Sequence, residues 1–218
     1  METFITLDNK KSSIPKEFQD NDNRFPESMV EYLLKKYSKK GDKVMDVFAG
    51  LGTSLIVSEK LGRIPFGIEF DKKRFDFIKK KIKHKENIIH GDALKLDEYS
   101  FPKFDLCIAS PPYMSATCKE NPFRNSKGTY NDYIKDIKSI YQKLKKNMKK
   151  DSYIIIEVSN LKGQETTTLA WDIGKELSKT FYFEGEIIIG WKNKGTCKGN
   201  GTYGYGYDHS YCLIFKNK

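Results

Sequence analysis

Short β-branched apolar runs alternate along the chain with longer segments that have apolar residues at helical spacing. The apolar runs have the length and composition of buried strands, and they lie at 43–49, 64–70, 87–92, 104–110 and 152–159. The segments with helical spacing lie at 26–40, 53–62, 71–83, 131–150 and 166–179. Alternating strands and helices predict an α/β fold in which helices cover both faces of a mostly parallel sheet.

The C-terminal part of the chain departs from this alternation. Two apolar runs, 185–192 and 210–216, follow each other with no helical segment between them. They predict an antiparallel pair at the end of the sheet and bring the expected strand count to seven. No repeat or linker divides the 218 residues, so we expect a single domain over 1–218.

Composition narrows the class of protein. No apolar run approaches the roughly 20 residues of a membrane span, and the N-terminus lacks the pattern of a signal peptide. The four cysteines show no metal-ligand spacing, so we expect reduced thiols, no metal site and a cytoplasmic protein. The net charge of +10 suits a polyanionic partner, although lysine-rich helix faces and a biased genome explain such a charge equally well.

A glycine turn follows the first predicted strand, in the sequence DVFAGLGTS at 46–54. Gly50 and Gly52 allow a tight turn and close approach of the backbone to a ligand. Leu55 stands where the third glycine of a dinucleotide-binding turn would be, which argues against a nicotinamide cofactor. Asp46, directly before the turn, would repel a pyrophosphate but suits a ligand with an ammonium group.

Acidic residues also follow the next two strands. Glu69 lies where a carboxylate accepts hydrogen bonds from ribose hydroxyls, and Asp92 is placed to accept one from an exocyclic adenine amine. Because parallel strands end at one edge of a sheet, Asp46, Glu69 and Asp92 predict a pocket for a cationic nucleoside. S-adenosylmethionine fits this description, whereas each acid taken singly could equally be a helix cap or a turn residue.

The fourth strand ends in Ser110, Pro111, Pro112 and Tyr113. With DVFAGLGTS, GIEFD, GDA, RFPESMVEYLL and SYCLIFKNK, this tetrapeptide resembles the motifs of the amino-group DNA methyltransferases, which modify N4 of cytosine or N6 of adenine. The resemblance covers most of the chain. It implies a Rossmann-like seven-stranded sheet with an antiparallel last strand, S-adenosylmethionine as cofactor, and DNA as partner.

The resemblance also implies roles for the tetrapeptide. The Ser110 hydroxyl and the Pro111 carbonyl would accept hydrogen bonds from the target amine, Pro112 would stiffen the turn, and Tyr113 would stack on an extruded base. Serine in the first position is more typical of cytosine-N4 enzymes. N6-adenine methylation, RNA or protein-glutamine methylation, and a non-catalytic nucleic-acid-binding module remain alternatives.

Further residues are weaker candidates. Phe48 could pack against the cofactor, and Arg24 and Phe25 could close over its methionine end. The chain leaves no room for a separate target-recognition domain, so DNA sequence would be read by 114–130, by the glycine- and tyrosine-rich loop 195–207, or by a partner protein. A companion restriction endonuclease also stays open. We expect Trp171 in the core and a structural role for His209.

Overall fold

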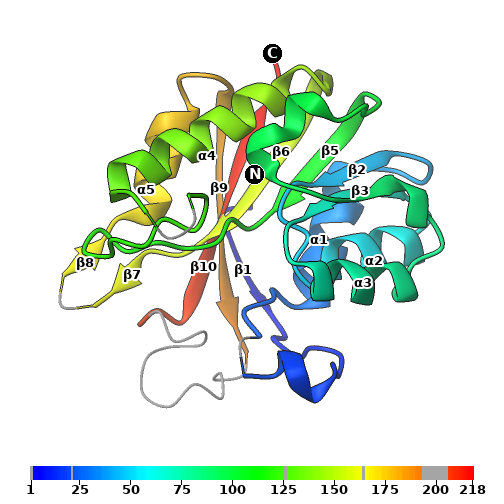
Figure 1. Cartoon of the computed structure of the whole chain (residues 1–218), viewed down its shortest axis with the longest axis horizontal. Coiled ribbons are helices and arrows are strands. Elements are labelled where there is room, and N and C mark those ends of the chain that lie inside the picture. Colours follow the sequence, from blue (N-terminus) through cyan, green and yellow to red (C-terminus); the bar gives the residue numbers. More distant parts are fainter. Residues whose placement is uncertain (1, 21, 125–126, 164, 193–205) are drawn as a thin grey trace.

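The computed structural model describes residues 2–20, 22–124, 127–163, 165–192 and 206–218 (Figure 1). Its main sheet has eight strands in the order β1-β9-β10-β6-β5-β2-β3-β4. Their bounds are β1 Phe4–Leu7, β2 Lys43–Asp46, β3 Ile64–Glu69, β4 Ile88–His90, β5 Phe104–Ala109, β6 Met148–Val158, β9 Tyr182–Trp191 and β10 His209–Lys216. Only β10 runs antiparallel to its neighbours in this sheet, which confirms the expected α/β architecture with an antiparallel C-terminal strand.

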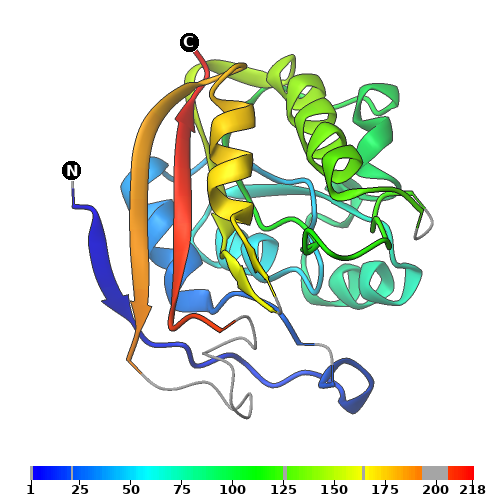
Figure 2. The same ribbon diagram turned by 90° about the vertical axis from the view of Figure 1, so that its left-hand side faces the viewer.

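The sheet has one strand more than the seven that the sequence pattern predicts. The extra strand is β1, which pairs in parallel with β9 and covers the outer edge of the predicted antiparallel pair (Figure 2). Within β1 only Ile5 is buried, so the four-residue strand carries almost no alternation of apolar and polar positions. Beside it, β10 lies between β6 and β9 and hydrogen-bonds to both.

Helices cover the two faces of the sheet (Figures 1 and 2). One face carries α1 Glu27–Tyr37, α2 Thr53–Lys60 and α3 Lys72–Lys81, and the other carries α4 Tyr130–Lys145, α5 Leu169–Leu177 and the 3₁₀ segment Ala93–Glu98. Further short elements are the 3₁₀ turns Lys16–Phe18 and Lys85–Asn87 and the small hairpin β7 Leu161–Lys162 with β8 Thr166–Thr167.

The apolar residues of the central strands alternate between two cores. Leu106 and Ile108 of β5 pack with the buried face of α1, while Cys107 between them packs with α4 and α5. Residues buried on both faces produce the continuous apolar runs seen in the sequence. The expectation that Trp171 is a core residue was wrong. It is 61 % exposed, because α5 buries a different side of the helix, with Leu169, Ala170, Ile173 and Leu177.

The topology fixes which segments meet at the functional edge of the sheet. Parallel strands β2 to β6 end at their common carboxyl edge, where ligands of open α/β sheets bind. Because β10 is antiparallel, its first residue His209 lies at that edge together with Trp191, the last residue of β9. Residues 193–205 between these two strands, which include Tyr203 and Tyr205 of the tyrosine-rich loop, lie outside the described residues.

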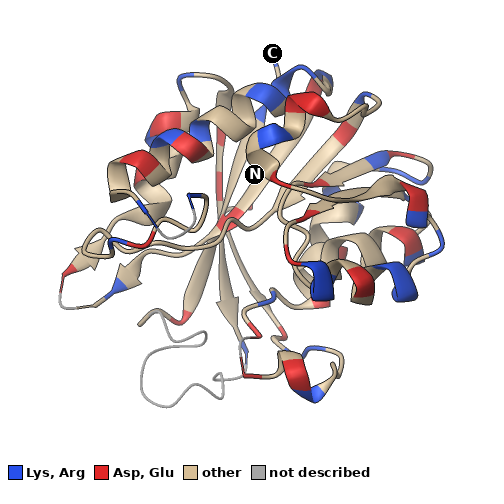
Figure 3. Ribbon diagram, in the orientation of Figure 1, with Lys and Arg blue, Asp and Glu red and all other residues tan. Residues whose placement is uncertain are grey.

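Charged residues of both signs are interspersed over the surface helices, and basic residues do not occupy one helix alone (Figure 3). The positive net charge of +10 is thus spread over the fold. Among the described residues, no helix combines the length and the apolar character that crossing a membrane requires.

Candidate active site

A cavity of about 930 Å³ opens at the carboxyl edge of the sheet. It is lined by residues from the predicted motifs except the C-terminal SYCLIFKNK, and these residues include Arg24, Phe25, Phe48, Gly50, Glu69, Asp92, Ser110, Pro111, Pro112 and Tyr113. Asp46 and Gly52 are not among the lining residues. The fold therefore gathers ten of the twelve predicted site residues around one space, although they span ninety positions of sequence.

The glycine turn between β2 and α2 needs both of its glycines. Gly50 and Gly52 have φ of +58° and +80°, and a Cβ on Gly52 would lie 2.9 Å from Ile78 Cγ1. Asp46 lies behind the turn, 1 % exposed, where it accepts hydrogen bonds from the Phe48 N–H at 2.9 Å and from the Ser54 hydroxyl. Burial raises the pKa of Asp46 to about 7, and these hydrogen bonds oppose the rise. Asp46 thus shapes the turn from behind instead of facing the cavity.

Glu69 holds the other side of the glycine turn. Its Oε2 accepts from the Gly50 N–H at 2.6 Å and its Oε1 from the Asp71 N–H at 2.8 Å. Burial raises the pKa of this carboxyl group, while the two backbone hydrogen bonds lower it. Each carboxylate oxygen has a second lone pair, so Glu69 can bind the turn and still accept from ligand hydroxyls.

Two more groups near Glu69 suit an adenosine. Asp92 lines the cavity and its Oδ1 accepts from the Leu94 N–H at 2.9 Å, which fixes the carboxylate at the start of the 3₁₀ segment. Phe70 lines the cavity with its side chain 69 % exposed. A large exposed ring at a cavity rim is a surface that a planar ligand can cover, and the sequence pattern did not single it out.

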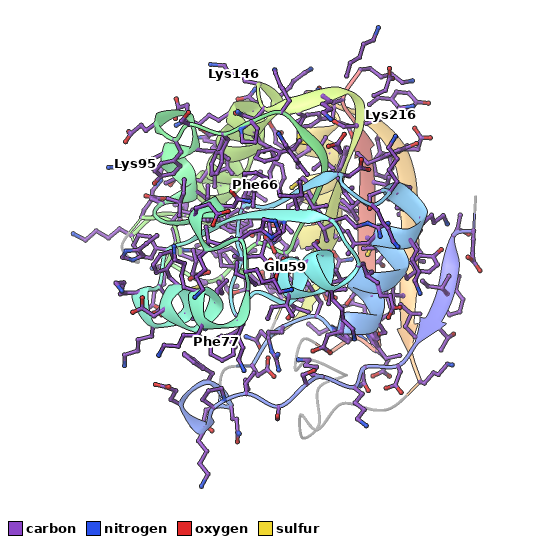
Figure 4. The ribbon with its side chains drawn as sticks, turned by 90° about the vertical axis from the view of Figure 1, so that its right-hand side faces the viewer. Glu59, Phe66, Phe77, Lys95, Lys146 and Lys216 are labelled. Carbon is purple, nitrogen blue, oxygen red and sulfur yellow. The ribbon has the colours of Figure 1, made fainter. Side chains whose placement is uncertain are left out.

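The N-terminal segment crosses beside the cavity. Arg24 and Phe25 line it, and Arg24 is held by Asp22, with Nε 2.8 Å from Oδ1. Earlier in this segment, the Phe18 ring packs edge-on against Phe77 of α3 with centroids 5.5 Å apart. Figure 4 labels Phe77 on the side of α3 that faces the N-terminal segment. The segment thus spans from β1 to α3 and brings Arg24 and Phe25 to the predicted cofactor region.

The Ser110–Tyr113 turn leaves β5 at the opposite side of the cavity. Pro111 is buried, Pro112 is exposed, and Ser110 and Tyr113 are half-buried. The Tyr113 hydroxyl donates to Glu157 Oε2 at 3.3 Å. The Ser110 hydroxyl interacts with the same carboxylate, and this interaction lowers the pKa of Glu157.

Glu157 is a site residue that the sequence pattern missed. It lies near the end of β6, lines the cavity, and is only 6 % exposed. Burial raises the pKa of this carboxyl group, and hydrogen bonds from Ser210, Ser110 and Tyr113 lower it. The only signal in the sequence was an acidic residue inside the apolar run IIIEVS.

The residues around the cavity fit S-adenosylmethionine. Glu69 and Asp92 offer acceptors for a nucleoside, and Phe70 offers an exposed ring. The Thr53 hydroxyl, buried in the cavity wall at the start of α2, has no protein hydrogen-bond partner. An unsatisfied buried hydroxyl and an exposed ring in one cavity are both features that a bound ligand removes.

Comparisons with known proteins agree with this geometry. The model of the N6/N4 methyltransferase family, described as DNA methylase, matches residues 3–80, from β1 through the glycine turn and Glu69 to α3. The resemblance to the amino-group DNA methyltransferases is confirmed over these residues, and Asp92 and the Ser110–Tyr113 turn lie outside the matched range. The family model and the methyltransferase fold support S-adenosylmethionine as the cofactor. No curated protein matches the chain.

Solved structures show the same fold. TrmN from Thermus thermophilus superposes with a TM-score of 0.62 at 14 % identity, over 87 % of this chain and 48 % of that one, so this chain spans about half of its length. A TehB-like SAM-dependent methyltransferase from Corynebacterium glutamicum gives 0.56 at 14 %, over 93 % and 94 %. An rRNA methylase from Streptococcus thermophilus gives 0.54 at 12 %, over 94 % and 98 %. Identities this low establish the methyltransferase fold alone.

Proposed function

We propose that the protein is an S-adenosylmethionine-dependent DNA methyltransferase that modifies N4 of cytosine. One observation carries the proposal: a single cavity joins the glycine turn, Glu69 and Asp92 to the Ser110–Tyr113 turn. The first group is a set of acceptors for a nucleoside cofactor, and the second is a set of acceptors for an amine. Group transfer needs both reactants in one space, and proximity and orientation supply much of the acceleration.

The cofactor side is organised by Glu69, which fixes the Gly50 N–H and presents free lone pairs to ribose hydroxyls. Asp92 would accept a hydrogen bond from the exocyclic amine of the adenine, and Arg24 and Phe25 would cover the methionine end. When bound, S-adenosylmethionine supplies an electrophilic methyl group on a sulfonium. Asp46 acts on this side indirectly, since it holds the Phe48 N–H and the start of the glycine turn.

The amine side is organised by Ser110. Its oxygen and the Pro111 carbonyl accept the two N–H bonds of the target amine, which localises the nitrogen lone pair for direct attack on the methyl group. The new N–C bond forms as the C–S bond breaks, and the amine loses one proton. The Ser110 oxygen receives that proton, while the proton of the Ser110 hydroxyl passes to Glu157. Burial raises the pKa of Glu157, so this carboxylate has a higher affinity for a proton.

A nucleic acid is supported as substrate by a row of side chains at the start of β10. The Lys162 amine lies 4.6 Å from the centre of the Tyr207 ring, and the rings of Tyr207, His209 and Tyr211 follow at centroid distances of 5.4 and 5.1 Å. Lys162 directly follows Leu161, which lines the cavity. Cationic and aromatic side chains beside a base pocket suit phosphate contact and base stacking.

To test the proposal, the purified protein is incubated with labelled S-adenosylmethionine and, in separate reactions, with duplex DNA, RNA or a protein mixture. Nucleoside mass spectrometry then identifies the methylated base. N4-methylcytosine from DNA supports the proposal. This is the product expected because Ser110 begins the tetrapeptide, as is more typical of cytosine-N4 enzymes. N6-methyladenine alone assigns the other branch of the family, and label in RNA alone overturns DNA as the substrate.

A further inference from the structure

A buried carboxylate on α4 ties down the segment that follows the Ser110–Tyr113 turn. Asp136 is 5 % exposed, and its Oδ2 accepts from Asn121 Nδ2 at 2.9 Å and Arg124 Nε at 2.7 Å. Its Oδ1 accepts from Arg124 Nη2 at 2.8 Å. Asn121 is fully buried, and its Oδ1 accepts from the Phe123 N–H at 2.9 Å. We name Asn121, Arg124 and Asp136 the loop latch.

Asn121 and Arg124 of the loop latch stand on either side of Phe123 in the sequence, and Phe123 lines the cavity. This ring stacks on Tyr133 of α4 with a centroid distance of 5.5 Å and an interplanar angle of 8°. The centre of the Phe123 ring also lies 5.7 Å from that of the Phe48 ring, which belongs to the glycine turn. Phe123 therefore connects α4 to the side of the cavity that faces the predicted cofactor.

Asp136 itself does not line the cavity, so its effect on a ligand must pass through the residues it holds. A buried carboxylate costs free energy unless it is fully hydrogen-bonded, and here the three hydrogen bonds all go to the segment that carries Phe123. A wall that is ordered before binding does not have to be ordered by the ligand, which improves affinity. An aromatic wall also attracts a cationic ligand through its π-face.

We propose that Asp136 is a positioning residue that acts through Phe123 to complete the cofactor wall of the cavity. The inference rests on the proposed function, because it takes S-adenosylmethionine as the ligand of that wall. Both oxygens of Asp136 accept hydrogen bonds from N–H groups. In Asp136→Asn one oxygen becomes an NH2 group, so two donors must face each other and a hydrogen bond to Asn121 or Arg124 is lost. The latch then opens, and Phe123 loses its fixed place between Tyr133 and Phe48.

The test is a double-mutant cycle read by calorimetric titration of S-adenosylmethionine into the full-length protein. Asp136→Asn and Phe123→Ala should each raise the Kd about tenfold, which corresponds to the loss of one ordered aromatic contact. Because the two act in one chain of contacts, the double variant should bind no more weakly than Phe123→Ala. Phe123→Leu, which keeps an apolar side chain, should restore part of the affinity.

Glu176→Gln is the matched control. Glu176 lies on α5, and its Oε1 is 2.6 Å from Lys138 Nζ of α4. Because Glu176 does not line the cavity, the Kd of the variant should stay at the wild-type value. If Asp136→Asn does not fold, Arg124→Ala takes its place in the cycle, since the Arg124 side chain is 45 % exposed.

The two proposals fail in different ways. An unchanged Kd in Asp136→Asn, or an equal loss in the wild-type and Phe123→Ala backgrounds, overturns the positioning role. A wild-type protein that binds no S-adenosylmethionine overturns the proposed function and this inference with it.

Discussion

Replacing Glu157 by glutamine separates the chemistry of the target amine from cofactor binding. Glu157 accepts from the Tyr113 hydroxyl at 3.3 Å, and its interaction with the Ser110 hydroxyl lowers its pKa. Glutamine keeps the shape but removes the charge and one acceptor oxygen. A hydrogen bond to a charged group contributes about 1.5–3 kcal/mol. If that stabilisation is made in the transition state, kcat falls about 10- to 100-fold, since 1.36 kcal/mol is tenfold in rate.

The assay is methyl transfer to DNA across pH, with cofactor Kd measured in parallel. Because burial raises the pKa of Glu157, wild-type kcat should rise as pH rises through this raised pKa and Glu157 ionises. In Glu157→Gln this acidic limb should disappear while the cofactor Kd stays unchanged. Glu186→Gln, which alters an exposed carboxylate on β9, should behave as wild type. A Glu157→Gln variant with wild-type kcat and the wild-type pH profile would refute Glu157 as proton acceptor.

Three further changes test other parts of the site. Ser110→Ala should lose most methyl transfer and keep its cofactor Kd in calorimetry; a collapse of cofactor binding would contradict the assigned role. Glu69→Ala should weaken S-adenosylmethionine binding about tenfold or more by the same titration, through loss of the Gly50 contact and the ribose acceptor. Burial raises the pKa of Asp46 from its ordinary value of 3.8 to about 7, so between these two pH values the folded state holds a proton that the unfolded chain has lost. Wild-type stability should therefore fall as pH rises from about 4 to about 7. In Asp46→Asn, the free energy of unfolding measured with denaturant should no longer fall over this pH range. If it falls as steeply as in the wild type, a group other than Asp46 causes the pH dependence.

Much of the fold follows from local pattern. The buried strands have continuous β-branched runs and the helices have apolar stripes, so their order and the antiparallel β10 could be predicted. The strand β1 could not, because pairing with β9 creates it and only Ile5 in it is buried. Trp171 was misplaced because helical spacing alone does not say which stripe of α5 faces the sheet.

The candidate site was predictable where it depends on strand ends. Glu69 ends a strand, and Gly50 and the Ser110–Tyr113 turn follow one, and parallel strands bring such residues to one edge. For Glu157 the sequence offers only an acidic residue inside an apolar run, and the loop latch depends on side-chain contacts between a loop and α4 that no motif marks. Asp46 shows the limit of the strand-end argument, since its side chain turns behind the glycine turn and not into the cavity.

The most direct test of the central claim is the identity of the methylated nucleoside. Duplex DNA incubated with the protein and methyl-labelled S-adenosylmethionine is digested to nucleosides and analysed by mass spectrometry, with Ser110→Ala in a parallel reaction. The account predicts labelled N4-methylcytosine from the wild type and almost none from Ser110→Ala. Label in RNA or protein but not in DNA, or equal label from Ser110→Ala, would contradict it.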